Sequence, residues 1–385
     1  MKIVFLSNYY NRHQHPLSQA LFRLCGGEYT FIATSEMREE RRAMGYELDA
    51  YPDYVLRYYE NEETAARCRK LILDADVLLV GSAPENLLKE RCRANKLILR
   101  YAERPLRRGK EPFKYLPRLV RWHLRNPQHR PYYLLCAGAY TFSDYRRFFL
   151  YKDRAFRWGY FPGVAEEQNE DALFSNKQKN KLLFCARLLP LKHPEHALET
   201  ARRLKERGIE FTLDFLGDGE MRDVLEEEIA RLNLSDCVHL CGNLKQEDVV
   251  EKMKEAGVFL LCSDAREGWG AVVNEAMGAG CAVVASDAAG SVPYLIYDRE
   301  NGIRYPSGNT DALTDEVADL LTHPEKQEVY GRAARKTVTG LWSAEVAAVR
   351  LIALCEALLN EPARAHTLFA DGPLSPAPLY KEKTF

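Results

Sequence analysis

The chain has 385 residues, which is long for one hydrophobic core and suits two domains. A hydrophobic content of 46%, a charged content of 28% and a formal net charge of −1 describe an ordinary globular protein, without an overall field that favours nucleic acid or acidic partners. The start MKIVFLSNYYNRH turns polar too early for a signal peptide, and no apolar run approaches the length of a membrane span, so we expect a cytoplasmic protein.

The first half of the chain alternates short apolar runs with amphipathic or charged segments. Residues 2–7 predict a strand, residues 8–15 a loop, and a helix begins near Pro16. Further apolar runs repeat this pattern, at residues 30–33, 77–80, 97–99 and 132–136. Parallel strands joined by helices form a doubly wound sheet, so we expect a Rossmann-like domain over residues 1–163.

Two residues of this first domain are candidate ligand contacts. Glu103 follows a predicted strand, at the sheet edge where α/β folds bind ligands. His13 lies in the loop after the first strand, and alternate histidines such as His13 and His15 are more often surface or substrate contacts than metal ligands. The D-x-D at residues 74–76 directly precedes a strand, which favours a helix end over a metal site. The ten scattered cysteines form no CxxC, so we expect reduced thiols and no metal centre.

The segment Arg104–Arg130 is strongly basic, and Glu111 is its only acid. Aromatic residues are interleaved with the basic ones, and apolar residues at 116, 119, 120 and 124 form a stripe at helical spacing. Basic amphipathic segments of this kind bind anionic membrane surfaces. They also bind nucleic acid or simply form a solvated face, and the segment alone does not decide among these.

The second half of the chain repeats the β/α alternation after a polar segment. Residues 164–180 are polar and weakly periodic, which predicts a linker. A second Rossmann-like domain is then expected over residues 181–342. Apolar residues at helical spacing predict a final helix within residues 343–362, and the proline-rich tail 363–385 is expected to be poorly ordered.

Two cations follow the first strand of the second domain. Arg187 and Lys192 lie in the loop at the carboxyl edge of this strand, where an Arg fork and a Lys point charge suit a diphosphate. The next strand ends in a turn that contains Gly217 and Gly219. This turn fails as a dinucleotide fingerprint, because Arg222 occupies the third glycine position.

The segment at residues 258–286 predicts a strand, a polar loop, a short helix at 270–278 and a second strand. This β–loop–α–β unit presents its loop at the carboxyl edge of a parallel sheet. Its residues are the main source of our functional hypothesis.

Two acids flank a glycine-rich turn in this unit. Gly268, Trp269 and Gly270 offer backbone N–H groups at a helix N-terminus, whose partial positive charge suits phosphate. Glu267 precedes the turn and Glu275 lies inside the helix, so a phosphate flanked by two hydroxyl-rich groups, as in a nucleotide-sugar, would fit. Alternatively, Glu267 is only a helix-dipole partner and Glu275 belongs to a solvated face.

The run EGWGAVVNEAMGAGCAVVAS resembles the signature of the GT-B glycosyltransferases of family 4, in which two glutamates with seven residues between them precede an alanine–methionine helix and an apolar strand. Arg187 and Lys192 match an arginine and a lysine of the family's donor loop, and the turn at 217–219 resembles its GxG turn. The resemblance implies two Rossmann-like domains that face each other across a cleft, with a C-terminal helix that crosses back to the first domain.

The resemblance also implies an activity. It is the transfer of a hexose or related sugar from a nucleotide-diphosphate sugar, with retention of anomeric configuration and without a metal or cofactor, because Arg187 and Lys192 neutralise the diphosphate. Glu267 then holds a donor-sugar hydroxyl and Glu275 the ribose. The turn Gly268–Ala271 binds phosphate. The base lies near Asn243 and Leu244, the GxG turn at Gly217 and Gly219 lines the donor site, and His13 and Glu103 face the acceptor.

The acceptor implied by the resemblance is a glycan or a lipid-linked saccharide, in cell-surface polysaccharide synthesis. A lipid-linked acceptor would make peripheral contact at the inner face of the membrane through Arg104–Arg130 useful. The sequence leaves two other functions open, a sugar-nucleotide epimerase or hydrolase of the same fold and a non-catalytic nucleotide-sugar binding protein. The loops at residues 11–15 and 289–294 depart from the family pattern of glycines.

Overall fold

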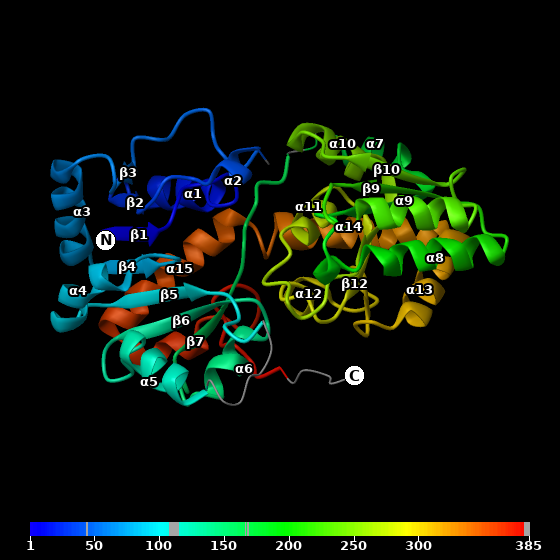
Figure 1. Ribbon diagram of the computed structural model, residues 1–385. Helices are drawn as coiled ribbons and strands as arrows, with labels where there is room; N and C mark the ends of the chain where they lie inside the picture. The colour runs from blue at the N-terminus through cyan, green and yellow to red at the C-terminus, as the bar shows by residue number, and fades with distance from the viewer. Residues whose placement is uncertain (44, 108–114, 166, 168, 381–385) are drawn as a thin grey trace. The chain divides into compact units, whose positions relative to one another are not determined.

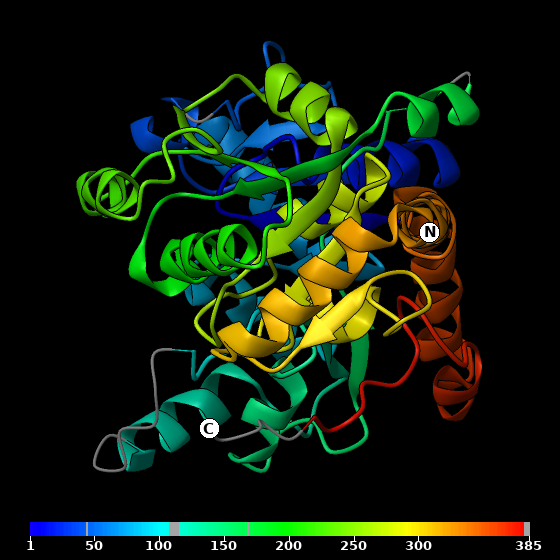
Figure 2. The same cartoon turned by 90° about the vertical axis from the view of Figure 1, so that its right-hand side faces the viewer.

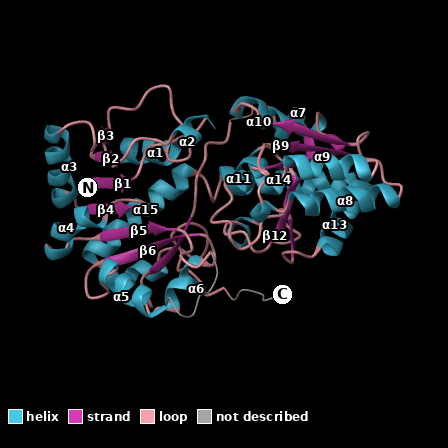
Figure 3. Cartoon of the chain, viewed as in Figure 1, coloured by secondary structure: helices cyan, strands magenta, loops and turns pink. Residues whose placement is uncertain are grey.

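The computed structural model describes residues 1–43, 45–107, 115–165, 167 and 169–380, and the chain divides into two compact units (Figure 1). The first unit comprises Met1–Gly163 together with Trp342–Phe385, and the second unit comprises Val164–Leu341. Each unit is a parallel β-sheet with helices packed around it (Figure 3). The prediction of two parallel-sheet α/β domains is confirmed.

The sheet of the first unit has the strand order β3-β2-β1-β4-β5-β6-β7, and neighbouring strands are parallel. The order reverses between β1 and β4, which is the place where open α/β sheets bind ligands beyond the strand ends. The strands are β1 Ile3–Ser7, β2 Tyr29–Ala33, β3 Val55–Arg57, β4 Val77–Val80, β5 Ile98–Ala102, β6 Tyr132–Ala137 and β7 Ala155–Trp158. The helices are α1 His15–Leu24, α2 Glu39–Ala43, α3 Glu62–Asp74, α4 Lys89–Arg93, α5 Tyr115–Arg125, α6 Thr141–Arg146 and α15 Ala344–Asn360, with 3-10 turns at Glu85–Leu88 and Pro362–Thr367.

The C-terminal segment belongs to the first unit. Helix α15 packs against α1, and the red segment after it returns to the first sheet (Figures 1 and 2). There Phe156 of β7 pairs with Pro376, and Ser143 donates a hydrogen bond to the carbonyl oxygen of Tyr380 over 2.7 Å. The expectation of a poorly ordered tail is therefore wrong for residues 363–380, because backbone pairing with β7 fixes them; residues 381–385 lie outside the described residues.

The sheet of the second unit has the strand order β10-β9-β8-β11-β12-β13, again parallel, and it reverses between β8 and β11. The strands are β8 Gln178–Cys185, β9 Thr212–Leu216, β10 Val238–Gly242, β11 Ala256–Leu261, β12 Ala282–Ser286 and β13 Ile303–Tyr305. The helices are α7 Glu170–Ser175, α8 Pro194–Glu206, α9 Arg222–Arg231, α10 Gln246–Glu255, α11 Val272–Gly278, α12 Val292–Leu295, α13 Thr310–Thr322 and α14 Pro324–Thr339, with a 3-10 turn at Pro190–Lys192.

The segment 164–180 is part of the second unit and is not a free linker. It contains helix α7, which Asn169 caps by accepting a hydrogen bond from the backbone of Ala172 over 3.0 Å, and β8 already begins at Gln178. Arg335 of α14 donates to Glu170 over 2.9 Å and to the carbonyl of Ala165 over 3.1 Å. Because Arg335 lies far from residues 164–180 in the sequence, the polar composition of this segment alone predicted a linker.

Within the described residues no single helix is long and apolar enough to cross a membrane, and one bent pair, α14 with α15, passes the same test of length and composition.

Candidate active site

The candidate site lies at the carboxyl edge of the second sheet, where the loops after β8, β9, β10 and β11 meet. Parallel strands bring these loops to one edge. Backbone hydrogen bonds tie them together: Leu188 donates to Asp218 over 2.9 Å, Asp264 to Leu191 over 3.0 Å, and Gly217 to Gly242 over 2.8 Å. The loops therefore form one connected backbone framework.

The two glycines of the turn after β9 allow a close backbone approach. A Cβ on Gly217, whose φ is +123°, would lie 2.1 Å from the carbonyl oxygen of Ala186. A Cβ on Gly219 would lie 2.5 Å from the carbonyl oxygen of Leu188. Both glycines are thus required by the packing of this turn against the loop that carries Arg187, whether or not a ligand also contacts them.

Two of the three predicted catalytic residues lie in direct contact. The Lys192 ammonium forms an ion pair with the Glu267 carboxylate, and the two side chains are only 14% and 13% exposed. Ser263 donates a further hydrogen bond to the same carboxylate oxygen over 3.1 Å. Lys192 comes from the loop after β8 and Glu267 from the loop after β11, the two strands at which the strand order reverses.

Glu275 lies on α11 in a half-buried position with little hydrogen bonding. Burial raises the pKa of its carboxyl group from 4.5 to about 7, and a hydrogen bond from the Gln246 side chain over 3.4 Å lowers it slightly. The charge of Glu275 in turn helps to raise the pKa of Cys185, at the end of β8, so the carboxylate faces this strand end. A carboxylate with so few donors among the described residues has room to accept hydroxyl groups.

The turn between the two acids is built around Trp269. Its side chain is 1% exposed, and its indole N–H donates to Asn274 over 2.8 Å. The prediction that Trp269 contacts substrate is therefore limited to its backbone, because the ring lies in the interior. Gly270 has a φ of +84°, and α11 begins at Val272, after Ala271, rather than at 270 as expected.

The other predicted residues of the second unit are exposed at the same edge. Arg187 is exposed in the loop after β8, and Asn243 and Leu244 are exposed in the loop after β10. Their side chains are accessible to a ligand on this edge.

His193 was not predicted and connects two loops of the site. Its Nε2 lies 3.1 Å from a carboxylate oxygen of Asp264, and its Nδ1 lies 2.7 Å from one of Glu195. These hydrogen bonds, to Asp264 first, raise the pKa of His193 to about 9. His193 has a φ of +47° and follows Lys192 directly, so this contact fixes the loop that carries Lys192.

In the first unit, Tyr160 links the two predicted residues, Glu103 and His13. The Tyr160 hydroxyl donates to Glu103 over 2.8 Å, and Arg107 donates to the other oxygen of Glu103 over 2.7 Å. The His13 ring lies between Tyr46 and Tyr160, with ring centroids 5.2 and 6.3 Å away. Burial lowers the pKa of His13 to about 4, so this imidazole is neutral at physiological pH.

Comparison with known proteins relates this geometry to one family. Residues 165–337 match the model of the family described as glycosyl transferases group 1. A segment of 162 residues is 35% identical to the amylovoran biosynthesis glycosyltransferase AmsK of Erwinia amylovora, and covers 41% of this chain and 39% of AmsK. A segment of 181 residues is 29% identical to the MMP alpha-(1->4)-mannosyltransferase of Mycolicibacterium hassiacum, and covers 46% and 43%. The matched segment thus spans less than half the length of these curated relatives.

Solved structures match over nearly the whole chain. Anabaena Alr3699/HepE in complex with UDP superposes with a TM-score of 0.67 at 14% identity, covering 92% of this chain and 98% of HepE. The pneumococcal O-GlcNAc transferase GtfA, in complex with UDP and GlcNAc, gives 0.63 at 12% identity and covers 94% and 99%. The fold is that of the GT-B glycosyltransferases, as the sequence predicted.

Proposed function

We propose that this chain is a glycosyltransferase that moves a sugar from a nucleotide-diphosphate sugar to a saccharide acceptor. The observation that carries the proposal is the placement of Lys192, Glu267 and Glu275 around one turn, at the strand-order reversal of the unit that matches the family model. The relatives support the substrate class, because the names of AmsK and of the putative WcaL enzyme describe polysaccharide biosynthesis. HepE and GtfA were solved with UDP.

The Lys192–Glu267 ion pair suggests how the donor is bound. A diphosphate that enters this edge competes with Glu267 for Lys192, because both are anions. When the phosphate takes the ammonium, Glu267 loses its cation and accepts a hydrogen bond from a hydroxyl of the donor sugar instead. One exchange of partners thus brings the phosphate to Lys192 and the sugar to Glu267.

The chemical step needs stabilisation of negative charge. The bond from the anomeric carbon to the β-phosphate oxygen breaks, a bond to an acceptor hydroxyl oxygen forms, and charge develops on the departing diphosphate. Preorganised cations and N–H groups lower this barrier most, and removal of one such donor typically costs about 10²–10³ in rate. We assign this work to Arg187, Lys192 and the turn amides, with retention of configuration and without a metal ion.

Glu275 is assigned to the ribose. Its carboxylate is partly desolvated and accepts one long hydrogen bond from Gln246, so two ribose hydroxyls would satisfy it better than the protein does. The acceptor is assigned to the first unit, where the neutral His13, Tyr160 and Glu103 offer an aromatic face beside a carboxylate. Aromatic rings with nearby hydrogen-bonding groups suit a saccharide.

We also propose that the protein is cytoplasmic and contacts the membrane peripherally through α5. Val120 and Leu124 are 56% and 78% exposed on α5, beside a groove of about 820 Å³ between α4 and α5. The basic residues that line the groove are Lys89, Arg93, Arg121, Arg125 and Arg130. Exposed apolar groups among cations suit anionic lipid, and co-sedimentation that does not depend on anionic lipid would refute this contact.

The substitution Lys192→Ala tests the proposed function. We expect the release of nucleotide from the sugar donor to fall by about 10²–10³ or more, because the phosphate loses its buried cation. Lys205→Ala is the matched control. Lys205 lies at the exposed end of α8 and pairs with Asp236, away from the loop that carries Lys192. Near-normal turnover in a folded Lys192→Ala protein would contradict the assignment. Consumption of the donor without any acceptor would favour an epimerase or hydrolase, and binding without turnover a non-catalytic binding protein.

A further inference from the structure

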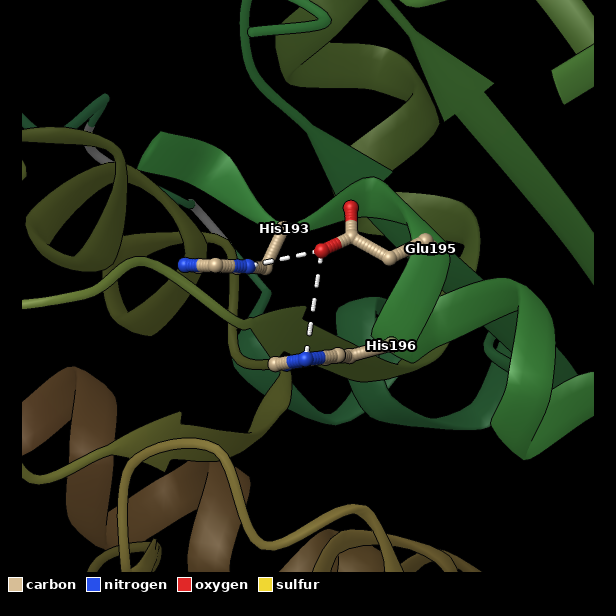
Figure 4. Close-up of side chains that lie close together, drawn as sticks. All are labelled: His193, Glu195 and His196. Carbon is tan, nitrogen blue, oxygen red and sulfur yellow. Dashed lines mark hydrogen bonds and ion pairs between the residues drawn. The ribbon is translucent and has the colours of Figure 1, made fainter. Parts of the chain in front are cut away.

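Beside the donor loop, two histidines and a glutamate at the start of α8 converge on one point. His193, Glu195 and His196 each present a ligand atom, and these atoms all lie within 4.8 Å of one another (Figure 4). Glu195 Oε1 lies 2.7 Å from His193 Nδ1 and 3.9 Å from His196 Nε2. The sequence predicted no metal centre, because the scattered cysteines form no CxxC, and the run H-P-E-H was not considered.

We propose that His193, Glu195 and His196 form a binding site for Zn²⁺, separate from the chemistry of sugar transfer. Two imidazoles and one carboxylate are a ligand set that zinc uses, with a fourth position left for water. Zinc bonds of about 2.1 Å place ligand atoms about 3.4 Å apart, so ligand atoms that now lie up to 4.8 Å apart must move closer by up to about 1.4 Å when the ion binds. Mg²⁺ and Ca²⁺ are excluded as the preferred ions, because they select oxygen ligands.

The surroundings of His193 support a metal. Its second ring nitrogen, Nε2, lies 3.1 Å from the carboxylate of Asp264. A metal-bound histidine usually donates its other N–H to such a carboxylate, which fixes the tautomer and leaves the first nitrogen for the ion. A bound Zn²⁺ replaces the proton that His193 otherwise shares with Glu195.

Two buried polar atoms in the cluster also lack a partner. Glu195 Oε2 and His196 Nδ1 make no hydrogen bond in the part of the chain that the structure describes. The His193 and His196 rings are stacked, with centroids 4.6 Å apart and planes 10° from parallel, so one ring must turn about its side-chain torsion before both rings can bind the same ion in their planes. The Glu195 side chain is 44% exposed, so an ion can reach its carboxylate from solvent.

Charge favours the site despite its position. The positive end of the α8 dipole disfavours a cation, but Glu195 lies in the first helical turn and Asp264 lies behind His193. Asp264 also pairs with Arg266 over 2.6 Å, so Glu195 is the carboxylate that offsets the positive end of the helix dipole. Because His193 follows Lys192, an occupied site would also hold the donor loop in place.

Metal binding to the full chain tests the proposal without any activity measurement. After treatment with a chelator, calorimetry should show one Zn²⁺ bound per chain, and Co²⁺ should give a visible spectrum of nitrogen and oxygen ligation. His196→Ala and Glu195→Gln should abolish this binding, whereas His239→Ala, at an exposed histidine of β10, should leave it unchanged. Asp264→Asn should weaken Zn²⁺ binding about 10- to 100-fold through the outer hydrogen bond.

Three results would overturn the site. One is equal Zn²⁺ binding in His196→Ala and in the unsubstituted chain. Another is a Co²⁺ spectrum dominated by thiolate charge transfer, which would assign the ion to free cysteines. The third is no Zn²⁺ binding at concentrations up to about 100 μM. Thermal unfolding of each variant checks that it is folded. If His196→Ala does not fold, Glu195→Gln provides the test.

Discussion

Glu275 should make donor binding depend on pH. Burial raises the pKa of its carboxyl group to about 7, and ribose hydroxyls bind the ionised form more strongly, because it accepts through both oxygens and carries the charge. Below pH 7 the protein must lose a proton before it binds. Between pH 8 and pH 6 the affinity for a UDP-sugar should therefore fall about tenfold, which corresponds to about 1.4 kcal/mol.

Calorimetric titration with a UDP-sugar measures this effect cleanly, because the two phosphates of the diester do not titrate in this range. The groups that face Glu275 are the Gln246 amide of α10 and the Cys185 thiol of β8, and the pKa of this thiol is raised far above 8. Glu275→Gln should bind more weakly at pH 8 and should show no such pH dependence. An unsubstituted chain with the same affinity at pH 6 and pH 8 would refute the reasoning.

The same substitution should stabilise the unliganded fold. The pKa of Glu275 is raised in the folded state, so the protonated carboxyl contributes stability that is present below pH 4.5 and lost as the pH rises through 7. A pKa of about 7 instead of 4.5 corresponds to ~3 kcal/mol at most. Glu275→Gln should then raise the unfolding temperature at pH 8 more than at pH 5. A carboxylate that serves binding is expected to destabilise the unliganded fold and to improve ligand binding.

Two further substitutions test the first unit. Tyr160→Phe should raise the KM for the acceptor several-fold and leave the KM for the donor unchanged, because it removes the hydrogen bond to Glu103 and keeps the aromatic ring; a change confined to the donor KM would contradict the acceptor assignment. Arg104→Ala should lower the free energy of unfolding by about 3–5 kcal/mol in urea titrations, because it removes the guanidinium that pairs with the Asp144 carboxylate, and both side chains are 2% exposed. A loss below about 1 kcal/mol, as for a surface pair, would show that Asp144 finds other partners.

The sequence predicted what is encoded locally. The β–loop–α–β unit around Glu267 and Glu275 was found because apolar runs, glycines and acids follow one another within thirty residues. Lys192 was singled out because it follows a strand of the second domain and because its spacing from Arg187 matches the donor loop of the family that the sequence resembles. Boundaries differed by a few residues, as for β8, whose polar start at Gln178 carries no apolar signal.

What the sequence did not predict depends on residues that are far apart in the chain. Tyr160 reaches Glu103 across 57 positions, and His193 reaches Asp264 across 71. Neither pairing leaves a periodic signal. Trp269 looked like a ligand contact because it lies between two glycines, but its partner Asn274 draws the ring inward.

The chain order of the two units has a consequence for biosynthesis. The second unit is complete once residue 341 has left the ribosome, whereas α1 and β7 still lack α15 and the strand pairing near Pro376. The first unit, whose synthesis begins first, is therefore completed last. Its strand β7 lacks the pairing near Pro376 while the second unit folds. A chaperone that protects the nascent chain would be needed most at that stage, on the N-terminal surface.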